Sequence, residues 1–239
     1  MPYRRLPNTD AARKTALSRA LELGKKMRPD ILAFSQSILA EINAFLPVFE
    51  QAMLMQKEAI TRQNENSGEY KESYKRAKLY ISHFIQVFNF AILRGELKSD
   101  QRLYFGMKKN DTCVPELSSE QELIYWAEKL IKGENERIIK RETAIQNPSI
   151  AVLKVYYDEF NEQYSFQKML RSITARANDK VSALRPKADL LILNLWNEIE
   201  AYYKGQIPEK LREQASYYGV KYVYRPHERN QTLIGQMAG

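Results

Sequence analysis

The stretch from residue 31 to residue 49, ILAFSQSILAEINAFLPVF, repeats apolar side chains at the spacing of an α-helix. Ile42, Phe45 and Phe49 are three or four residues apart, so they share one helix face. The same spacing recurs in four further stretches: 70–91, 123–133, 150–164 and 191–203. These patterns predict an all-α protein of five or six helices, arranged as an up-and-down four-helix-type bundle with one or two extra helices.

Polar residues at three places predict where helices begin or separate. Asn8-Thr9-Asp10 and Ser118-Ser119 offer side-chain oxygens that can accept hydrogen bonds from the first free N–H groups of a helix. Asn147-Pro148-Ser149 separates two helical runs. These positions define the starts of a first helix near residue 10, a helix near residue 120 and one near residue 150.

Glycine and proline predict helix ends or distortions. Gly68, Gly95 and Gly205 stand at or just after the ends of apolar series, where a left-handed residue often closes a helix. Pro47 lies inside a series, and a proline in a helix interior costs roughly 3 kcal/mol and removes a hydrogen bond. We therefore expect the helix to kink at Pro47 or to end and restart there.

A shift of 111 positions superposes two parts of the chain. Under this shift Phe49 falls on Phe160, and with small gaps Tyr104-Phe105-Gly106 meets Tyr217-Tyr218-Gly219. Chance explains matched apolar spacing between two amphipathic helices, but it does not readily explain an aromatic pair followed by glycine after each. The sequence thus predicts two pseudo-repeated helical halves, 29–110 and 111–220, because a helical hairpin cannot bury its apolar face alone.

Two terminal segments remain outside these halves. Residues 1–28 form a basic arm with a first helix, and residues 221–239 are expected to be an extended or disordered tail. Residues 220–225 alternate in strand fashion, between a glycine and a proline. An isolated strand is unstable, so this one must pair within the chain, pair with another subunit or stay extended.

The positive charge is concentrated at the N-terminus. The net charge is +8, and residues 1–28 carry eight Lys or Arg against Asp10 and Glu22. Such an arm could neutralise phosphates without reading sequence, which gives nucleic-acid binding as one alternative function. The candidate contacts are Arg4, Arg5, Arg13, Lys14, Arg19, Lys25, Lys26 and Arg28. Against this, a basic helix surface is often only solvated, and Tyr3 is the one interleaved aromatic residue of the arm.

Tyrosines gather near the C-terminus. Residues of this type anchor protein interfaces, although they can equally cover the end of the protein's own bundle. The candidate partner contacts are Tyr217, Tyr218, Tyr222 and Tyr224. The partner would be a second copy of the chain or another protein.

The sequence lacks the residue sets that carry most enzyme chemistry. The single cysteine, Cys113, and the histidines His83 and His227 provide no metal-ligand spacing, and no glycine-rich phosphate loop occurs. His83, in a helix rich in phenylalanine, is interpreted as a packed or hydrogen-bonded residue, and Cys113 as incidental despite two nearby lysines. We expect no catalytic residue, metal or cofactor.

The single cysteine and the charged residues that interrupt every apolar run also indicate where in the cell the protein is located. With no possible intramolecular disulfide and no uncharged run of 18 residues, the sequence predicts a cytoplasmic protein without a membrane span. The function expected is a non-enzymatic structural or protein-interaction bundle. Besides nucleic-acid binding, small-molecule binding between the halves is a second alternative, because pockets between bundle helices leave no spacing signal.

The opening MPYRRLPNTD, followed by a helix rich in alanine and leucine, resembles the start of uncharacterised bacterial all-helical proteins. The resemblance covers about the first 20 residues. It implies a bacterial source and an all-helical fold, and it carries no activity or site residues with it.

Overall fold

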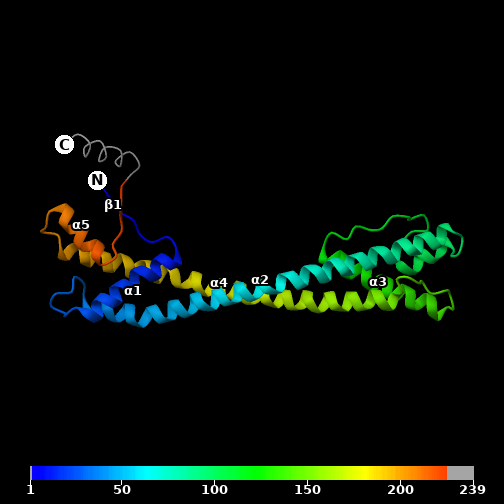
Figure 1. Cartoon of the computed structure of the whole chain (residues 1–239), viewed down its shortest axis with the longest axis horizontal. Coiled ribbons are helices and arrows are strands. Elements are labelled where there is room, and N and C mark those ends of the chain that lie inside the picture. The colour runs from blue at the N-terminus through cyan, green and yellow to red at the C-terminus, as the bar shows by residue number, and fades with distance from the viewer. Residues whose placement is uncertain (1, 225–239) are drawn as a thin grey trace. The chain divides into compact units, whose positions relative to one another are not determined.

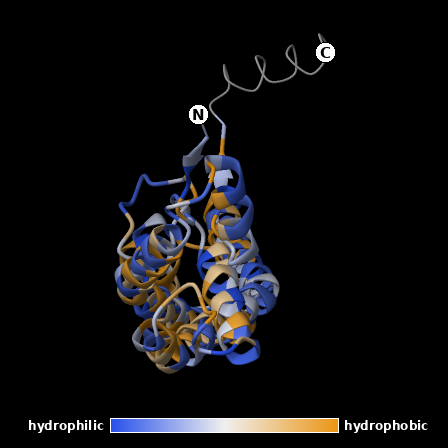
Figure 2. Cartoon of the chain, turned by 90° about the vertical axis from the view of Figure 1, so that its left-hand side faces the viewer, coloured by the Kyte–Doolittle hydropathy of each residue, from blue (hydrophilic) through white to orange (hydrophobic). Residues whose placement is uncertain are grey.

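The computed structural model describes residues 2–224, and it confirms the predicted all-α fold (Figure 1). The helices are α1 (Asp10–Lys26), α2 (Gln36–Leu93), the 3-10 helix η1 (Ser99–Phe105), α3 (Glu120–Ile139), α4 (Ile150–Tyr202) and α5 (Pro208–Tyr217). Two short strands, β1 (Tyr3–Arg4) and β2 (Tyr222–Val223), complete the described chain. Apolar and polar residues alternate along each helix ribbon, as amphipathic helices require (Figure 2).

The two long helices are more continuous than the sequence predicts. α2 runs for 58 residues and α4 for 53, so each joins two of the stretches expected as separate helices. The helix end expected at Gly68 does not occur, and nearby Asn66 is buried, with its amide donating to Gln167 at 2.9 Å. Side-chain pairing across the two helices thus outweighs the low helix propensity of Asn66 and Gly68.

Proline does not end either long helix. Pro47 lies inside α2 and Pro186 inside α4. The helix on both sides of Pro47 is buried through Phe45 and Phe49, so packing offsets the lost backbone hydrogen bond. Of the two outcomes expected at Pro47, the end and restart does not occur.

The described chain forms two compact units. Unit 1 contains the described residues of 1–59 and 174–239, and unit 2 contains residues 60–173. Each unit holds four helical segments: α1, the start of α2, the end of α4 and α5 in unit 1, and the end of α2, η1, α3 and the start of α4 in unit 2.

Each unit has its own core. In unit 1, Leu17 of α1 and Phe49 of α2 cluster with Trp196 of α4, and all three side chains are fully buried. In unit 2, Phe84 of α2 and Leu130 of α3 share a core with other fully buried aromatic residues. The short helices α1 and α3 therefore cover the exposed side of a long-helix pair within their own units.

The unit boundaries do not follow the predicted halves 29–110 and 111–220, since each unit takes residues from both halves. The reason is that α2 and α4 run antiparallel, which brings the start of one beside the end of the other. The order of elements, a short helix, a long helix and a short helix, occurs twice along the chain. The internal duplication itself stays a prediction.

Helix caps agree with the sequence at the starts and only partly at the ends. Thr9 caps α1, and Ser119 forms a reciprocal capping box with Glu122 at the start of α3. Gly95 has the predicted left-handed conformation with φ of 77°. The expectation is wrong for Gly68, which lies inside α2, and for Gly205, which does not have a positive φ.

The predicted C-terminal strand finds its partner within the chain. β2 pairs antiparallel with β1, so that Tyr3 lies opposite Val223 and Arg4 opposite Tyr222. The N–H of Arg5 also donates to the carbonyl of Lys221 at 2.9 Å. The basic arm and the tyrosine segment are therefore neighbours in unit 1, while residues 225–239 of the predicted tail, including His227, lie outside the described residues.

One described helix, α2, is long and apolar enough over an 18-residue window to cross a membrane, judged by length and composition. One third of that window is buried inside the protein. The core helix of a soluble protein passes the same test, so a single such helix is weak evidence. The absence of a membrane span stays a prediction.

We expect Gly133→Ala to destabilise the protein by about 1–3 kcal/mol. A Cβ atom at Gly133 would lie 2.5 Å from the backbone oxygen of Tyr104, so α3 would have to move away from η1. The matched control is Gly68→Ala, where the added Cβ meets nothing within 4 Å and helix propensity should add about 0.5–1 kcal/mol. Urea unfolding measures both, and equal effects would contradict the prediction.

Candidate functional site

The structure places most of the basic arm in contact with acidic side chains of unit 1. Arg4 pairs with Glu200 at 3.0 Å, and the Arg13 guanidinium donates to both carboxylate oxygens of Asp189, at 2.7 and 3.0 Å. Further ion pairs join Arg13 to Asp10, Lys14 to Glu50, Arg19 to Glu22 and Arg28 to Asp30. Among the described residues, Arg5, Lys25 and Lys26 make no ion pair.

Asp10 joins two arginines of this charge cluster, Arg13 and Arg185. It accepts hydrogen bonds from Arg185 at 2.8 and 2.9 Å and from Arg13 at 3.2 Å. The hydrogen bonds from Arg185, with the positive charges of both arginines, hold the pKa of the Asp10 carboxyl below its ordinary value of 3.8. The cluster ties α1 to the end of α4.

We expect Asp10→Asn to lower the stability of unit 1 at neutral pH by about 1 kcal/mol. Because the folded-state pKa of Asp10 is depressed, its contribution is present above pH 3.8 and is lost as the pH falls through the folded pKa. The variant should therefore lose less stability on acidification than the parent. Thermal unfolding between pH 2 and pH 7 measures this, with Asp30→Asn, in an exposed pair, as the control. Parallel acid profiles for the parent and Asp10→Asn would contradict the prediction.

The four candidate tyrosines are not equivalent. Tyr218 is buried in the core of unit 1, and the Tyr222 hydroxyl donates to Glu200 at 2.7 Å. Burial and the neighbouring carboxylate raise the pKa of Tyr222. Tyr217, stacked under the Arg19 guanidinium, and Tyr224 remain exposed. Two of the four tyrosines therefore close the unit itself, and two are left accessible.

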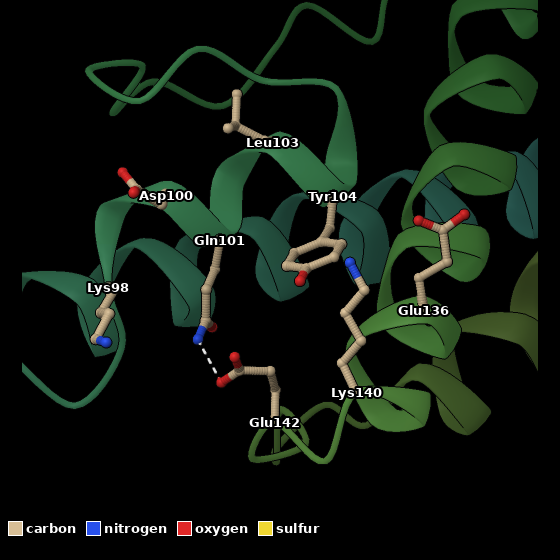
Figure 3. Close-up of a pocket in the computed structure, with 8 residues that line it drawn as sticks. All are labelled: Lys98, Asp100, Gln101, Leu103, Tyr104, Glu136, Lys140 and Glu142. Carbon is tan, nitrogen blue, oxygen red and sulfur yellow. Dashed lines mark hydrogen bonds between the residues drawn. The ribbon is translucent and has the colours of Figure 1, made fainter.

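A pocket of about 480 Å³ opens between η1, the end of α3 and the following loop in unit 2 (Figure 3). Its lining residues are Lys98, Asp100, Gln101, Leu103, Tyr104, Glu136, Lys140 and Glu142. Side chains of both charge signs point into it, and the Lys140 ammonium lies 4.7 Å from the centre of the Tyr104 ring. Such a lining suits a small polar ligand carrying charges of both signs.

A buried polar network stands behind this pocket. Arg137 and Glu134 form a fully buried ion pair, and the Arg137 guanidinium also donates to Gln101 at 2.9 Å and to the carbonyl of Thr143 at 2.9 Å. Glu134 accepts from the N–H of Ile145 at 2.8 Å. Gln101 in turn donates to Glu142 at the pocket wall, at 2.6 Å (Figure 3). The network fixes the loop that follows α3.

Sequence reasoning did not find this network. Glu134 and Arg137 are three residues apart on a helix, a spacing that usually marks an exposed ion pair. Their burial depends on η1, which lies more than 30 residues earlier in the chain, and on the loop after α3, which folds back over the end of its own helix. The described residues contain no group of histidine, cysteine and carboxylate side chains that could hold a metal ion.

A second hollow of about 440 Å³ lies beside Tyr80, His83, Pro148 and Val152 in unit 2. Tyr80 stacks on Tyr156 with ring centres 4.1 Å apart. Of the two interpretations of His83, packed or hydrogen-bonded, the first is wrong, because the side chain is exposed at the edge of this hollow. The helix places Phe84 and Phe88 inward and His83 outward.

The outward side of α4 in unit 2 carries a second heptad row of five apolar residues and two glutamates, which we call the α4 seam. It consists of Val152, Val155, Glu159, Glu162, Phe166, Met169 and Ile173, at alternating spacings of three and four. Its five apolar side chains are between 40% and 63% exposed. The inward row of α4, with Leu153 and Phe160, is buried. Heptad counting outside the buried row would have found the seam in the sequence.

Cys113, the single cysteine, is exposed in the connection between η1 and α3. No protein-family model, curated protein or solved structure matches this chain.

Proposed function

We propose that the protein is a non-enzymatic helical bundle that binds a protein partner through the α4 seam. The observation that carries the proposal is the exposure of five apolar side chains at heptad positions of one helix, in two groups on either side of Glu159 and Glu162. Apolar residues scattered singly over a surface are ordinary, but exposed apolar groups aligned on one helix face are typical of an interaction surface.

The energetics favour a covered seam. Removing apolar surface from water contributes about 25 cal/mol per Å², and Phe166 and Met169 keep close to half of their surface in water. The α4 helix is already held by its buried row, so the seam is not needed for folding. A partner helix can therefore use it at no cost to the core.

Two observations bear on the alternative functions. In the basic arm, Arg4, Arg13 and Lys14 form ion pairs with Glu or Asp residues of the same chain. Fewer cations are therefore free to bind phosphates than the number of Lys and Arg residues in the sequence suggests. The pocket beside Tyr104 favours small-molecule binding as a second candidate, because the buried network behind Gln101 holds its wall in place. Thermal shift against zwitterionic metabolites tests that candidate.

Site-specific photo-crosslinking in the source cells tests the proposal. A benzophenone amino acid at position 166, in place of an exposed phenylalanine, should give a discrete adduct with another polypeptide. The control places the same amino acid at Lys168, which is exposed on α4 outside the seam. Adducts at both positions, or at neither, would overturn the proposal, provided that circular dichroism shows both variants folded.

A further inference from the structure

We infer that the α4 seam takes an amphipathic helix with a basic centre between two apolar ends. This inference rests on the proposed function and names the chemistry of the partner. The alternating spacing of three and four is that of a coiled-coil contact, in which apolar side chains of one helix enter the spaces of another. From Val152 to Ile173 the seam is about 32 Å long, which corresponds to a partner helix of about 20 residues.

Charge is arranged along the seam in three blocks. Val152 and Val155 form one apolar end, and Phe166, Met169 and Ile173 form the other. Between them stand two carboxylates, Glu159 and Glu162. The seam is thus apolar, acidic and apolar in order, and the complementary helix is apolar, basic and apolar.

The central carboxylates have room for a cationic partner. Glu159 meets Arg76 only at 3.6 Å, and both side chains are about half exposed. Glu162 forms no ion pair within the described part of the chain. A lysine or arginine from the partner would therefore add charge pairs without breaking a strong one.

The same carboxylates argue against three other occupants. In a symmetric dimer of two seams, an antiparallel arrangement brings Glu162 close to its own copy, and a parallel arrangement places every carboxylate opposite itself. Anionic membrane lipids and nucleic acids meet the same repulsion. A basic helix is the occupant for which the centre of the seam is attractive.

One end of the seam also offers a place for a large side chain. Val152 lines the hollow of about 440 Å³ that Tyr80 and Pro148 also border. An aromatic or leucine side chain from the end of the partner helix can enter there, since such anchors supply most of the binding energy of a helix in a groove.

Fluorescence anisotropy with labelled 20-residue peptides and the full chain tests the inference. The first peptide carries Leu at the heptad positions near each end and Lys at the two central heptad positions. It also has Phe at one terminus. The second has Glu at those two central positions and is otherwise identical. We expect the basic-centred peptide to bind at least about tenfold more tightly, because like charges in a contact are strongly unfavourable.

Charge reversal on the protein makes the test specific. Glu159→Lys with Glu162→Lys should invert the preference between the two peptides, and Phe166→Ala with Met169→Ala should weaken both by about tenfold. The matched control is Lys154→Ala, an exposed site on α4 outside the seam. Circular dichroism and light scattering check that every variant is folded and report any self-association.

The outcomes separate the two proposals. Equal binding of the two peptides, unchanged preference in the charge-reversed variant, or self-association lost with Phe166→Ala would overturn the basic-helix inference. If a crosslinked partner at position 166 persists in that case, the proposed function stands with a different partner. If no crosslink forms at position 166 and neither peptide binds, both proposals fail.

Discussion

Replacing Arg137 by alanine is expected to lower the free energy of unfolding of unit 2 by about 3–5 kcal/mol. The substitution leaves the Glu134 carboxylate fully buried without its cation, and it removes the donors to Gln101 and to the Thr143 carbonyl. A buried charge without a partner is far more costly than the same pair is stabilising. The effect should appear in unit 2, where all these groups lie.

The two tryptophans allow each unit to be observed by itself. Trp126 lies in unit 2 and Trp196 in unit 1, so a Trp196→Phe background leaves unit 2 as the source of tryptophan fluorescence. Urea unfolding in that background should show the loss for Arg137→Ala. The control Arg94→Ala breaks an exposed pair with Glu96 and should change stability by less than about 1 kcal/mol.

A second variant separates the cost of leaving one buried charge unpaired from the contribution of the intact ion pair. Glu134→Leu with Arg137→Leu removes both charges and fills the space with apolar side chains, so it should recover part of the loss. If Arg137→Ala alone destabilised unit 2 no more than Arg94→Ala does, the buried network would not be what stabilises unit 2 and holds the loop after α3.

The second large effect is expected for Phe160→Ala, which should cost unit 2 about 3–5 kcal/mol. Phe160 is fully buried, and its ring lies 5.8 Å from the ring of Tyr74 and 5.7 Å from that of Tyr164, measured between centres. Truncation leaves a cavity between α2 and α4 and removes these aromatic contacts. Urea unfolding followed by Trp126 fluorescence measures the loss.

Phe166→Ala is the matched control on the same helix. Phe166 belongs to the α4 seam and is 44% exposed, so its truncation should cost about 1 kcal/mol, well below the loss for Phe160→Ala. Phe160→Ala should therefore affect mainly stability, because Phe160 supports the fold, and Phe166→Ala should affect mainly partner binding. Similar losses of stability for both would show that the seam is packed in solution.

Much of the helical structure follows from the sequence because it depends on local features. The periodic apolar residues around Phe49 and Leu153 predict their helices, and Thr9 and Ser119 predict the starts of α1 and α3. The length of α2 does not follow in the same way. Asn66 and Gly68 look like a turn locally, and only the buried hydrogen bond from Asn66 to Gln167 shows why the helix continues.

The candidate sites were harder to predict because contacts between distant residues define them. In the sequence Arg13 looks like a free cation, but in the structure it pairs with Asp189, which is 176 residues away along the chain. Arg137 reads as a surface residue, yet Gln101 and the loop after α3 enclose it. In contrast, the exposed heptad of the α4 seam was present in the sequence, but spacing alone does not tell which of two apolar rows is buried.

The sequence by itself determined that this protein is all-α, with amphipathic helices, capped starts and a basic N-terminus, since each of these depends on residues within a few positions of one another. The tertiary structure decided that the basic arm pairs with β2 and with the acidic residues of α4, that Arg137 is buried, and that the α4 seam is exposed. The physical reason is that burial and charge pairing are set by which helices meet, and helix periodicity carries no information about the partner.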